Sequence, residues 1–282
     1  MNTAIVVLYR PTAEQIFKVR ANAVLFDETY IVDNSETPNS SAWDGDTLAY
    51  FHNANQGGIA GAYNRALANL DCKSQRYIFT LDQDTELPSE YCTDMVAFAE
   101  EQGALVCCPE FIDVNSRTRA GFAVLTRFGY RVNRDATTDF CISSGMCFDA
   151  SIFEQVRFDE RLTIDHVDTD ICLKLKELSV DIFVNRRVVL KHAIGTRSKR
   201  SFAGLRLTPT NHLPVRRYYI VRNGWYLAFK YWRKYPGFFV LNFNRTAHEF
   251  LCVVLYEKQK FEKLKMMAYG LTHAVVKKLG KY

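Results

Sequence analysis

The chain has 282 residues, 48% of them hydrophobic and 24% charged, which is enough for one large domain or one domain with an appended segment. The best candidate for a membrane-spanning helix, around residues 237–243, is far shorter than the roughly 18 apolar residues required. Met1 leads directly into an apolar stretch without a basic region, so we expect no signal peptide. The eight cysteines form no C-x-x-C pair, so we expect reduced thiols and a cytoplasmic protein.

The net charge of +5 conceals two regions of opposite sign. Residues 1–196 hold 18 Lys and Arg against 28 Asp and Glu, a balance of −10, whereas residues 197–282 hold 18 against 3, a balance of +15. A basic segment that is also rich in aromatic residues can contact nucleic acid or an anionic lipid surface. The composition alone leaves both partners open.

Strand and helix patterns alternate through the first 81 residues. A buried strand is expected at 4–8, further strands at 29–32, 48–52 and 77–81, and helices at 12–24 and 62–70. This rhythm predicts parallel strands in a doubly wound α/β layer. In such folds ligands bind beyond the carboxyl ends of the strands.

Polar residues follow three of these strands. Asp33 comes after the second strand, residues 53–61 after the third, and Asp82 and Asp84 after the fourth. Two carboxylates in a loop at a strand end can bind a divalent cation, which in turn can hold a diphosphate. The alternative is that Asp and Asn are common in turns for backbone reasons alone.

Three glycines, Gly57, Gly58 and Gly61, precede or begin the helix expected at 62–70. They can serve only to shape the loop, or they can let backbone amides approach a ribose or a phosphate. The spacing is neither G-x-G-x-x-G nor a P-loop, which disfavours dinucleotide-binding and NTPase functions.

The middle of the chain reads as shorter strands and turns from 104 to 142, followed by a helix near 151–156. A second acidic cluster, Asp165, Asp168 and Asp170, leads into a helix at 171–178. These acids can be catalytic or can simply stabilise the helix N-terminus. His192 follows a strand at 188–190 and is either structural or a ligand.

The C-terminal region is expected to be helical from Val215 to Tyr235 and again from Asn242 onward. A set of apolar residues shares one face of the last helix, namely Phe261, Leu264, Ala268, Leu271 and Val275. A set of lysines is assigned to its polar surface, namely Lys258, Lys260, Lys263, Lys265, Lys277 and Lys278. Such helices either pack on the catalytic domain or contact the anionic cytoplasmic leaflet.

Taken together, the segments at 6–9, 31–35, 55–64, 81–84, 144–145, 164–170 and 190–192 resemble the inverting family-two glycosyltransferases of GT-A fold. More narrowly, Leu81 to Thr85, Ile164 to Asp170 and Arg217 to Asn223 resemble bacterial rhamnosyltransferases that build surface polysaccharide such as O-antigen. The resemblance extends to about residue 225. It implies a Rossmann-like nucleotide-diphospho-sugar transferase with a mostly parallel central sheet and a C-terminal helical extension.

The resemblance also assigns roles to matching positions. Asp33 would hydrogen-bond the pyrimidine base, and the segment from Asn55 to Asn64, with Gly58, would shape the base and ribose pocket. Asp82 and Gly145 would belong to the nucleotide-sugar site. Asp84 would bind Mg²⁺ or Mn²⁺, and His192 would complete the metal or diphosphate shell.

Asp168 matches the catalytic base of the family, although position 167 is Val where a Glu-Asp pair is commoner, so Asp165 and Asp170 stay as alternatives. The chemistry agrees independently, because an inverting transfer needs one carboxylate to take the acceptor proton and a cation to hold the leaving diphosphate. Two acidic clusters on different elements meet both needs.

We therefore expect a catalytic domain at 1–210 and a basic, aromatic-rich helical segment at 211–282. The expected enzyme moves L-rhamnose from dTDP-β-L-rhamnose to a glycan on a polyprenyl-diphosphate lipid, at the inner face of the cell membrane. The alternatives are a UDP-hexose or UDP-galactofuranose transferase of the same fold, and a nucleic-acid-binding module. The acidic first region and the lack of a recognition motif disfavour nucleic acid as a partner.

Overall fold

The computed structural model describes residues 1–43, 47–113, 118–192, 200–202 and 204–282. These residues pack into two compact units. Unit 1 comprises residues 1–112 and 134–191 with Lys281, and unit 2 comprises residues 113–133 and 192–280 with Tyr282. The boundary expected at residue 210 lies inside unit 2, which also takes a hairpin from the middle of the chain.

Unit 1 is built on a sheet in the order β3-β2-β1-β4-β10-β5-β11-β9. The strands that come first in the chain are β1 (Asn2–Leu8), β2 (Glu28–Asp33), β3 (Leu48–His52) and β4 (Tyr77–Asp82), and they pair in parallel. The remaining strands are β5 (Val106–Asp113), β9 (Thr137–Thr138), β10 (Met146–Asp149) and β11 (Ile182–His192). Strand β10 is antiparallel to both β4 and β5.

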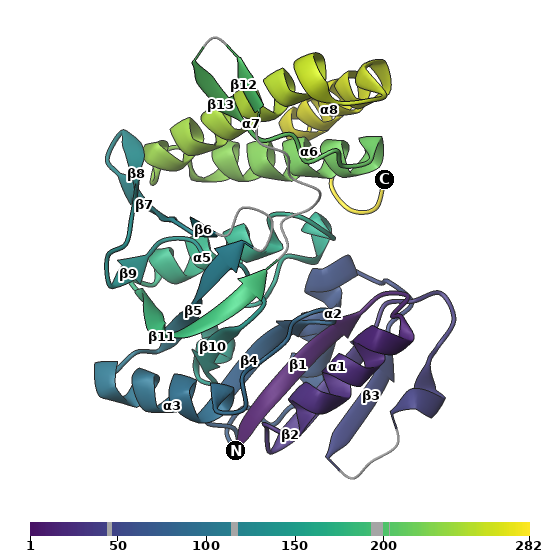
Figure 1. The fold of residues 1–282 in the computed structure, drawn as a ribbon, viewed down its shortest axis with the longest axis vertical. Coiled ribbons are helices and arrows are strands. Elements are labelled where there is room, and N and C mark those ends of the chain that lie inside the picture. The colour runs from purple at the N-terminus through teal and green to yellow at the C-terminus, as the bar shows by residue number, and fades with distance from the viewer. Residues whose placement is uncertain (44–46, 114–117, 193–199, 203) are drawn as a thin grey trace. The chain divides into compact units, whose positions relative to one another are not determined.

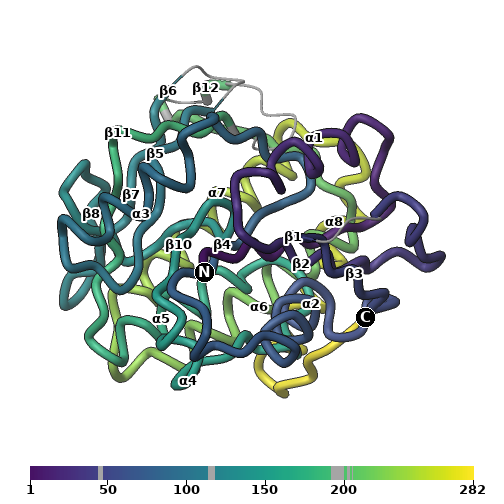
Figure 2. The backbone as a smooth tube through the Cα atoms, turned by 90° about the horizontal axis from the view of Figure 1, so that it is seen from below, coloured from purple at the N-terminus to yellow at the C-terminus, as the bar shows by residue number. Residues whose placement is uncertain are grey.

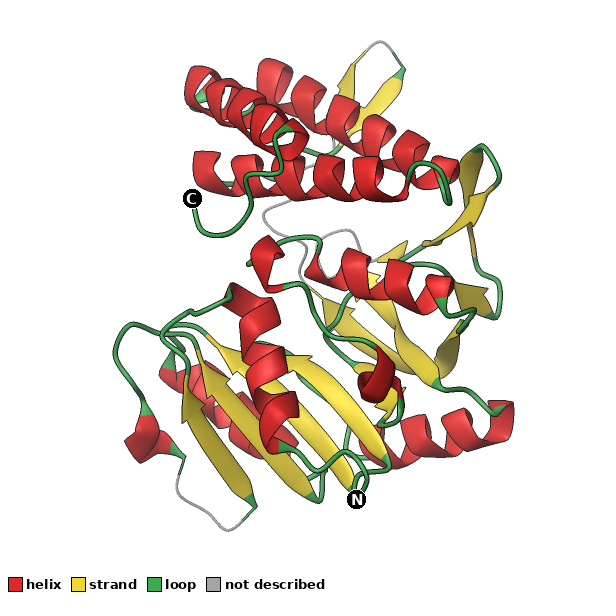
Figure 3. Ribbon diagram, turned by 180° about the vertical axis from the view of Figure 1, so that it is seen from behind, coloured by secondary structure: helices red, strands yellow, loops and turns green. Residues whose placement is uncertain are grey.

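Helices cover both faces of the parallel part of this sheet. Helix α1 (Ala13–Ala23) begins at a capping box in which Thr12 accepts from the backbone of Gln15 and the Gln15 side chain accepts from Thr12. Helix α2 (Gly58–Asn69) follows β3. Figure 2 shows α1 and α2 on opposite sides of β1 and β2, and Figures 1 and 3 show the two faces in turn.

The other helices of unit 1 are α3 (Tyr91–Gln102), α4 (Ile152–Gln155) and α5 (Val167–Glu177), with short 3₁₀ turns η1 (Ser40–Ala42) and η2 (Glu160–Leu162). Strands β1 and β4 are buried almost throughout, because they lie inside the sheet and are covered on both faces. The polar residues that end β2, β3 and β4 therefore come together at the carboxyl edge of the sheet, as the sequence predicts.

Unit 2 contains three long helices, α6 (Pro214–Tyr231), α7 (Pro236–Tyr256) and α8 (Lys260–Val275), which pack against one another (Figure 1). Its short strands are β6 (Thr118–Arg119), β7 (Phe122–Thr126), β8 (Gly129–Asn133), β12 (Arg200–Phe202) and β13 (Leu205–Leu207). Strands β7 and β8 form a hairpin that packs on α7, and β12 pairs with β13. Helix α7 starts at Pro236, six residues before the expected position, because proline fits the first turn of a helix.

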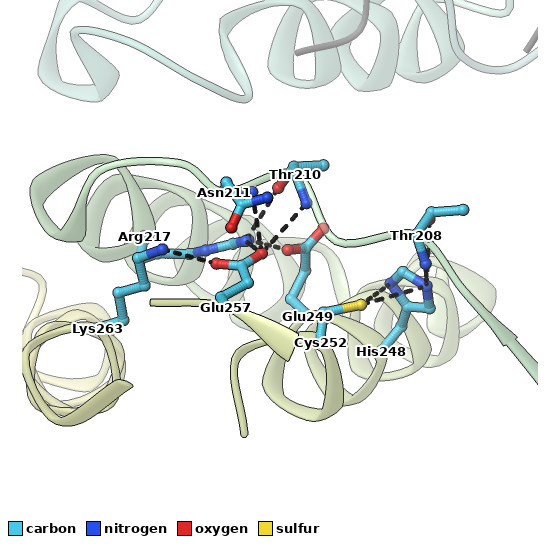
Figure 4. A network of polar contacts seen from close by, with 9 residues as sticks. All are labelled: Thr208, Thr210, Asn211, Arg217, His248, Glu249, Cys252, Glu257 and Lys263. Atoms are coloured by element: carbon cyan, nitrogen blue, oxygen red, sulfur yellow. Dashed lines mark hydrogen bonds and ion pairs between the residues drawn. The ribbon is translucent and has the colours of Figure 1, made fainter. Parts of the chain in front are cut away.

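Buried charges tie the segment after β13 to these helices. Arg217 of α6 is 1% exposed and bonds to Glu249, to Glu257 at 2.5 Å and to the Thr210 hydroxyl at 2.9 Å. Glu257 also accepts from Lys263 Nζ at 2.9 Å (Figure 4). The expectation that Lys263 lies on the polar surface of α8 is wrong, since its side chain is only 4% exposed and is held by this ion pair.

Candidate active site

The carboxylates of Asp82 and Asp84 lie where β4 leaves the sheet. Asp82 is half-buried and Asp84 is exposed, so the chain passes from core to solvent within three residues. Ser144 supports this turn from one side, because its hydroxyl accepts from Asp82 N at 3.1 Å and shares a hydrogen bond with Thr85 Oγ1 at 2.5 Å. The turn is thereby fixed to the segment before β10.

The residue between the two acids supports the turn from the other side. The side chain of Gln83 accepts from Tyr9 N at 2.7 Å and donates to Tyr9 O at 3.2 Å. Both backbone groups of Tyr9, just after β1, are engaged by one amide. The position of the carboxylates is therefore set by contacts from β1 and from the β10 side.

The electrostatic environment of Asp82 includes the second acidic cluster, through Asp168. Burial, together with the negative charges of Asp84 and then Asp168, raises the pKa of Asp82 to about 7. Burial also raises the pKa of Tyr63, a fully buried residue of α2, with Asp82 and Asp168 adding to the effect. Three carboxylates, from β4, the turn after it and α5, thus share one region of unit 1 with one buried phenol.

The loop before Asp168 has an unusual backbone. Thr163, Asp165 and His166 all have positive φ, at 60°, 58° and 62°. Residues other than glycine pay roughly 1–2 kcal/mol each for this conformation, so neighbouring contacts must hold it. Helix α5 starts directly after His166 and carries Asp168 in its first turn, where Asp168 Oδ1 accepts from Thr169 N at 2.7 Å.

The two alternatives for the base differ from Asp168 in setting. Asp170 is fully buried and forms an ion pair with Lys174 at 2.7 Å, one turn along the same helix. Asp165 is half-buried and lies in the left-handed loop. The charge of Asp168 is among the causes that raise the pKa of Asp82.

Gly58 provides one of the contacts that hold this loop. Its φ is +62°, and a Cβ atom there would lie 2.1 Å from the backbone oxygen of Thr163. The neighbouring Ile59 N donates to that same oxygen at 2.8 Å. The structure thus gives Gly58 a close backbone contact with the loop that leads to Asp168, a role that the sequence did not indicate.

Asn64 connects the same two segments. Its Nδ2 donates to Phe158 O and to Glu160 Oε1, both at 2.9 Å, and its Oδ1 accepts from Phe158 N at 3.1 Å. All of these partners are in the stretch before the loop. Asn64 therefore connects α2 by hydrogen bonds to the segment that leads to the second acidic cluster.

Asp33 ends β2 with its carboxylate fully buried. It accepts from Ser35 N at 2.8 Å, from Asn39 Nδ2 at 2.9 Å and from the Tyr50 hydroxyl at 2.8 Å. Burial alone raises the pKa of Asp33, but these hydrogen bonds outweigh it, so the net shift is downward. The ionised carboxylate organises the turn that follows β2.

Asn55 and Gly145 adopt backbone conformations with positive φ, 56° and 85°. Asn55 precedes the start of α2. A Cβ atom at Gly145 would lie 2.8 Å from Leu190 and 3.2 Å from the Tyr91 hydroxyl, which donates to Gly145 O at 2.5 Å. Gly145 is thus required by close packing beneath the Asp82 turn.

Within the ranges that the structure describes, no group of three or more His, Cys, Asp or Glu side chains is arranged to hold a metal ion. The side chain of His192, at the end of β11, lies outside the described residues. The donor set of Asp82 and Asp84 nevertheless suits a hard cation, because carboxylate oxygens are its preferred ligands. The pKa of Asp82 is raised first by burial and then by the negative charges of Asp84 and Asp168, and a divalent cation would compensate these charges.

Three supporting residues were missed from the sequence: Tyr63, Gln83 and Ser144. Gln83 and Ser144 lie within or beside the motifs, and their positions in the sequence were the only indication that they support the acidic turn. Tyr63 lies within the segment at 55–64, but nothing in its sequence context indicates that a helix would bury its ring beside two acids.

Comparison with known proteins agrees with this geometry. Residues 11–157 match the profile of glycosyl transferase family 2, more than half of the chain. The chain belongs to that family. Among curated proteins, it is 30% identical over 182 residues to the dTDP-rhamnosyl transferase RfbF of Shigella flexneri, a match that covers 61% of this chain and 60% of that protein.

Solved structures agree on the fold. S. aureus TarS 1-349 in complex with UDP-GlcNAc is similar over 97% of this chain and 81% of that one, with a TM-score of 0.58 and 14% identity. GalNAc-T7 with UDP, GalNAc and Mn²⁺ is similar over 82% and 49%, with a TM-score of 0.53 and 12% identity. The fold is GT-A, as expected, with a mostly parallel central sheet and C-terminal helices. The family match and the fold therefore agree with the resemblance on which the sequence interpretation was based.

Proposed function

We propose that this glycosyltransferase moves L-rhamnose from dTDP-β-L-rhamnose onto a glycan acceptor, with inversion at the anomeric carbon. The observation that carries the proposal is that the negative charges of Asp84 and Asp168 both act on the Asp82 carboxylate in unit 1. The identity to a dTDP-rhamnosyl transferase supports the choice of donor. A UDP-hexose or UDP-galactofuranose donor is the second candidate, favoured by the similarity to a TarS structure that holds UDP-GlcNAc.

In this mechanism the Asp168 carboxylate takes the proton of the acceptor hydroxyl as its oxygen attacks the anomeric carbon. The bond from that carbon to the diphosphate breaks on the opposite face, and dTDP leaves. Asp82 and Asp84, together with His192, would hold a Mg²⁺ or Mn²⁺ ion. That cation would neutralise the charge that develops on the diphosphate.

The nucleotide side of the site is proposed from the other positions. Asp33 would recognise the pyrimidine N3–H by exchanging one of its present donors, Asn39 or Tyr50, for the base. Asn55 would line the base and ribose pocket. Gly58, Asn64 and Gly145 would act on the donor through the backbone that they fix.

A donor panel tests the proposal. Thermal unfolding is measured with dTDP-rhamnose, UDP-glucose, UDP-GlcNAc, UDP-galactofuranose and GDP-mannose, each with Mn²⁺ or with EDTA. A ligand at 100 times its dissociation constant stabilises by roughly 2.7 kcal/mol, so the preferred donor should stand out. We expect dTDP-rhamnose with Mn²⁺ to give the largest shift, and Asp84→Ala to remove the part that depends on metal.

Release of the nucleotide during transfer then separates binding from turnover. If a UDP-sugar is preferred in both the thermal-unfolding and the nucleotide-release assay, the donor is a UDP-sugar and not dTDP-rhamnose. Full turnover in EDTA would contradict the role of the cation. Equal affinity for GDP and dTDP would contradict the role of Asp33, because a purine lacks the pyrimidine N3–H edge.

We also propose that the acceptor glycan is carried by a polyprenyl-diphosphate lipid and that unit 2 contacts the anionic inner face of the membrane. None of the helices among the described residues is long and apolar enough to cross a bilayer. Exposed Lys258, Lys260 and Lys265 would each contribute about 1 kcal/mol near an anionic surface. Changing these three to Gln, with buried Lys263 left intact, should reduce salt-sensitive binding to anionic vesicles.

A further inference from the structure

The three long helices of unit 2 line an apolar pocket of about 550 Å³ that is open to the surface. Its walls include Val221 and Trp225 from α6, Phe243 and Phe250 from α7, and Leu264 and Leu271 from α8. Pockets of roughly 300–1,000 Å³ are typical of sites for small molecules. The lining is apolar on all three helices, so the pocket suits a hydrocarbon group.

The apolar face of α8 continues from the pocket onto the surface. Phe261 is 78% exposed, Val275 61% and Leu271 41%, and on α7 Phe243 is 55% and Phe250 48% exposed. The apolar face for which the sequence left packing and membrane contact open is therefore largely uncovered. Exposed apolar area of this kind marks a contact with a membrane, a ligand or another protein.

The charge of the surface around the pocket favours a membrane among these partners. Residues 197–282 contain only three acids, and two of them, Glu249 and Glu257, are engaged inside unit 2 by Arg217 and Lys263. The third is the exposed Glu262. The outer surface of the helices is consequently dominated by cations, among them Lys258, Lys260 and Lys265. A second copy that docks through the same face would bring like charge against like charge, whereas an anionic lipid surface is complementary.

We infer that the pocket between α6, α7 and α8 receives one acyl chain of an anionic membrane phospholipid. The inference rests on the membrane contact given under the proposed function. It adds to that contact a specific binding pocket for one acyl chain. The surrounding cations hold the headgroup, and the pocket removes the chain from water. Membrane binding would then combine charge attraction with the insertion of one lipid acyl chain into the pocket.

Trp225 provides a direct reporter, because it lines the pocket. The other two tryptophans, Trp43 and Trp232, are replaced by Phe so that fluorescence comes from Trp225 alone. Vesicles of phosphatidylglycerol with bromine on the acyl chains should quench this emission on contact. Vesicles of phosphatidylcholine with the same bromine label should quench it several-fold less, because they lack the negative charge.

Filling the pocket tests its role in binding. Ala247 and Ala268 line it from α7 and α8, and Ala247→Phe with Ala268→Phe should occupy the space of the chain. We expect affinity for phosphatidylglycerol vesicles to fall by about tenfold or more and quenching to be lost. Thr272→Phe, an exposed position of α8 that does not line the pocket, is the matched control and should stay within about twofold.

A short-chain phosphatidylglycerol below its critical micelle concentration should shift Trp225 emission in the unfilled protein and not in the filled one. Vesicle binding without quenching, or binding unchanged by filling, would overturn the pocket while leaving membrane contact standing. Loss of a dimer on filling would assign the pocket to a second copy, and a response to a prenyl diphosphate alone would assign it to the acceptor; both overturn the inference. None of these readouts depends on sugar transfer, so a wrong donor would not affect them.

Discussion

Each unit holds a cluster of charged groups, and the two clusters differ in whether opposite charges are paired. In unit 1, Asp82, Asp84 and Asp168 bring like charges into one region, and burial together with these charges raises the pKa of Asp82 to about 7. In unit 2, Arg217 and Lys263 meet Glu249 and Glu257 in a balanced network, and the pKa of Glu257 is lowered (Figure 4). An uncompensated cluster is poised for a ligand, whereas a compensated one serves the fold.

The largest expected effect concerns catalysis in the uncompensated cluster. Asp168→Asn keeps the shape of the side chain and removes its basicity, so turnover should fall by roughly 10²–10⁴ while affinity for the donor stays nearly unchanged. Steady-state kinetics and donor titration measure the two quantities. Asp165→Asn serves as the control, and a dead Asp165→Asn beside an active Asp168→Asn would move the base to Asp165.

The compensated cluster should show its effect in stability instead. Arg217→Met leaves Glu257 buried with one cation fewer, so the free energy of unfolding should fall by about 3–5 kcal/mol, as for other broken buried pairs. Denaturant unfolding measures the change. Arg187→Met, which breaks an exposed pair with Glu101, is the matched control and should change stability little. Equal losses in the two variants would contradict the distinction between the clusters.

The backbone beneath the acidic cluster allows a sharper comparison between two glycines of nearly equal φ. Gly58 and Gly103 lie at +62° and +61°, but a Cβ atom at Gly58 would meet Thr163 O at 2.1 Å, while Gly103 has nothing within 4 Å. Gly103→Ala should therefore cost only the backbone strain, about 1–2 kcal/mol. Gly58→Ala should cost more and should also lower turnover, because it displaces the loop before Asp168. Similar unfolding midpoints for both variants would remove the packing role of Gly58.

The smallest expected effect is the pH dependence of the metal-free protein. The folded pKa of Asp82 lies above its unfolded value of 3.8, so the folded state keeps a proton that the unfolded state has lost. Its contribution to stability is present below about pH 4 and is lost as the pH rises to about 7. For this half-buried group we expect a loss of about 1–2 kcal/mol. Asp82→Asn should flatten the profile, and stabilisation by Mn²⁺ should grow over the same range in the unaltered protein.

Much of unit 1 could be predicted from the sequence because its signals are local. The period of apolar residues located β1 to β4, and the helix expected at 12–24 agrees closely with α1. The start of α2 was expected four residues late, because Gly57 and Gly58 resemble a loop and yet begin the helix with positive φ. The balanced network of unit 2 could not be predicted. Its partners come from three separate elements, and a lysine beside other lysines in the sequence gives no sign that it is buried.

The left-handed loop before Asp168 also limits how the sequence can drift over evolutionary time. Asp165 at φ 58° occupies a conformation that Asp, Asn and Gly tolerate and that Val or Ile do not. An acidic residue retained there among relatives would reflect backbone geometry as much as chemistry. A saturation library should separate the two, since Asp165 should accept Asn and Gly, whereas Asp168, in the first turn of a regular helix, should accept neither.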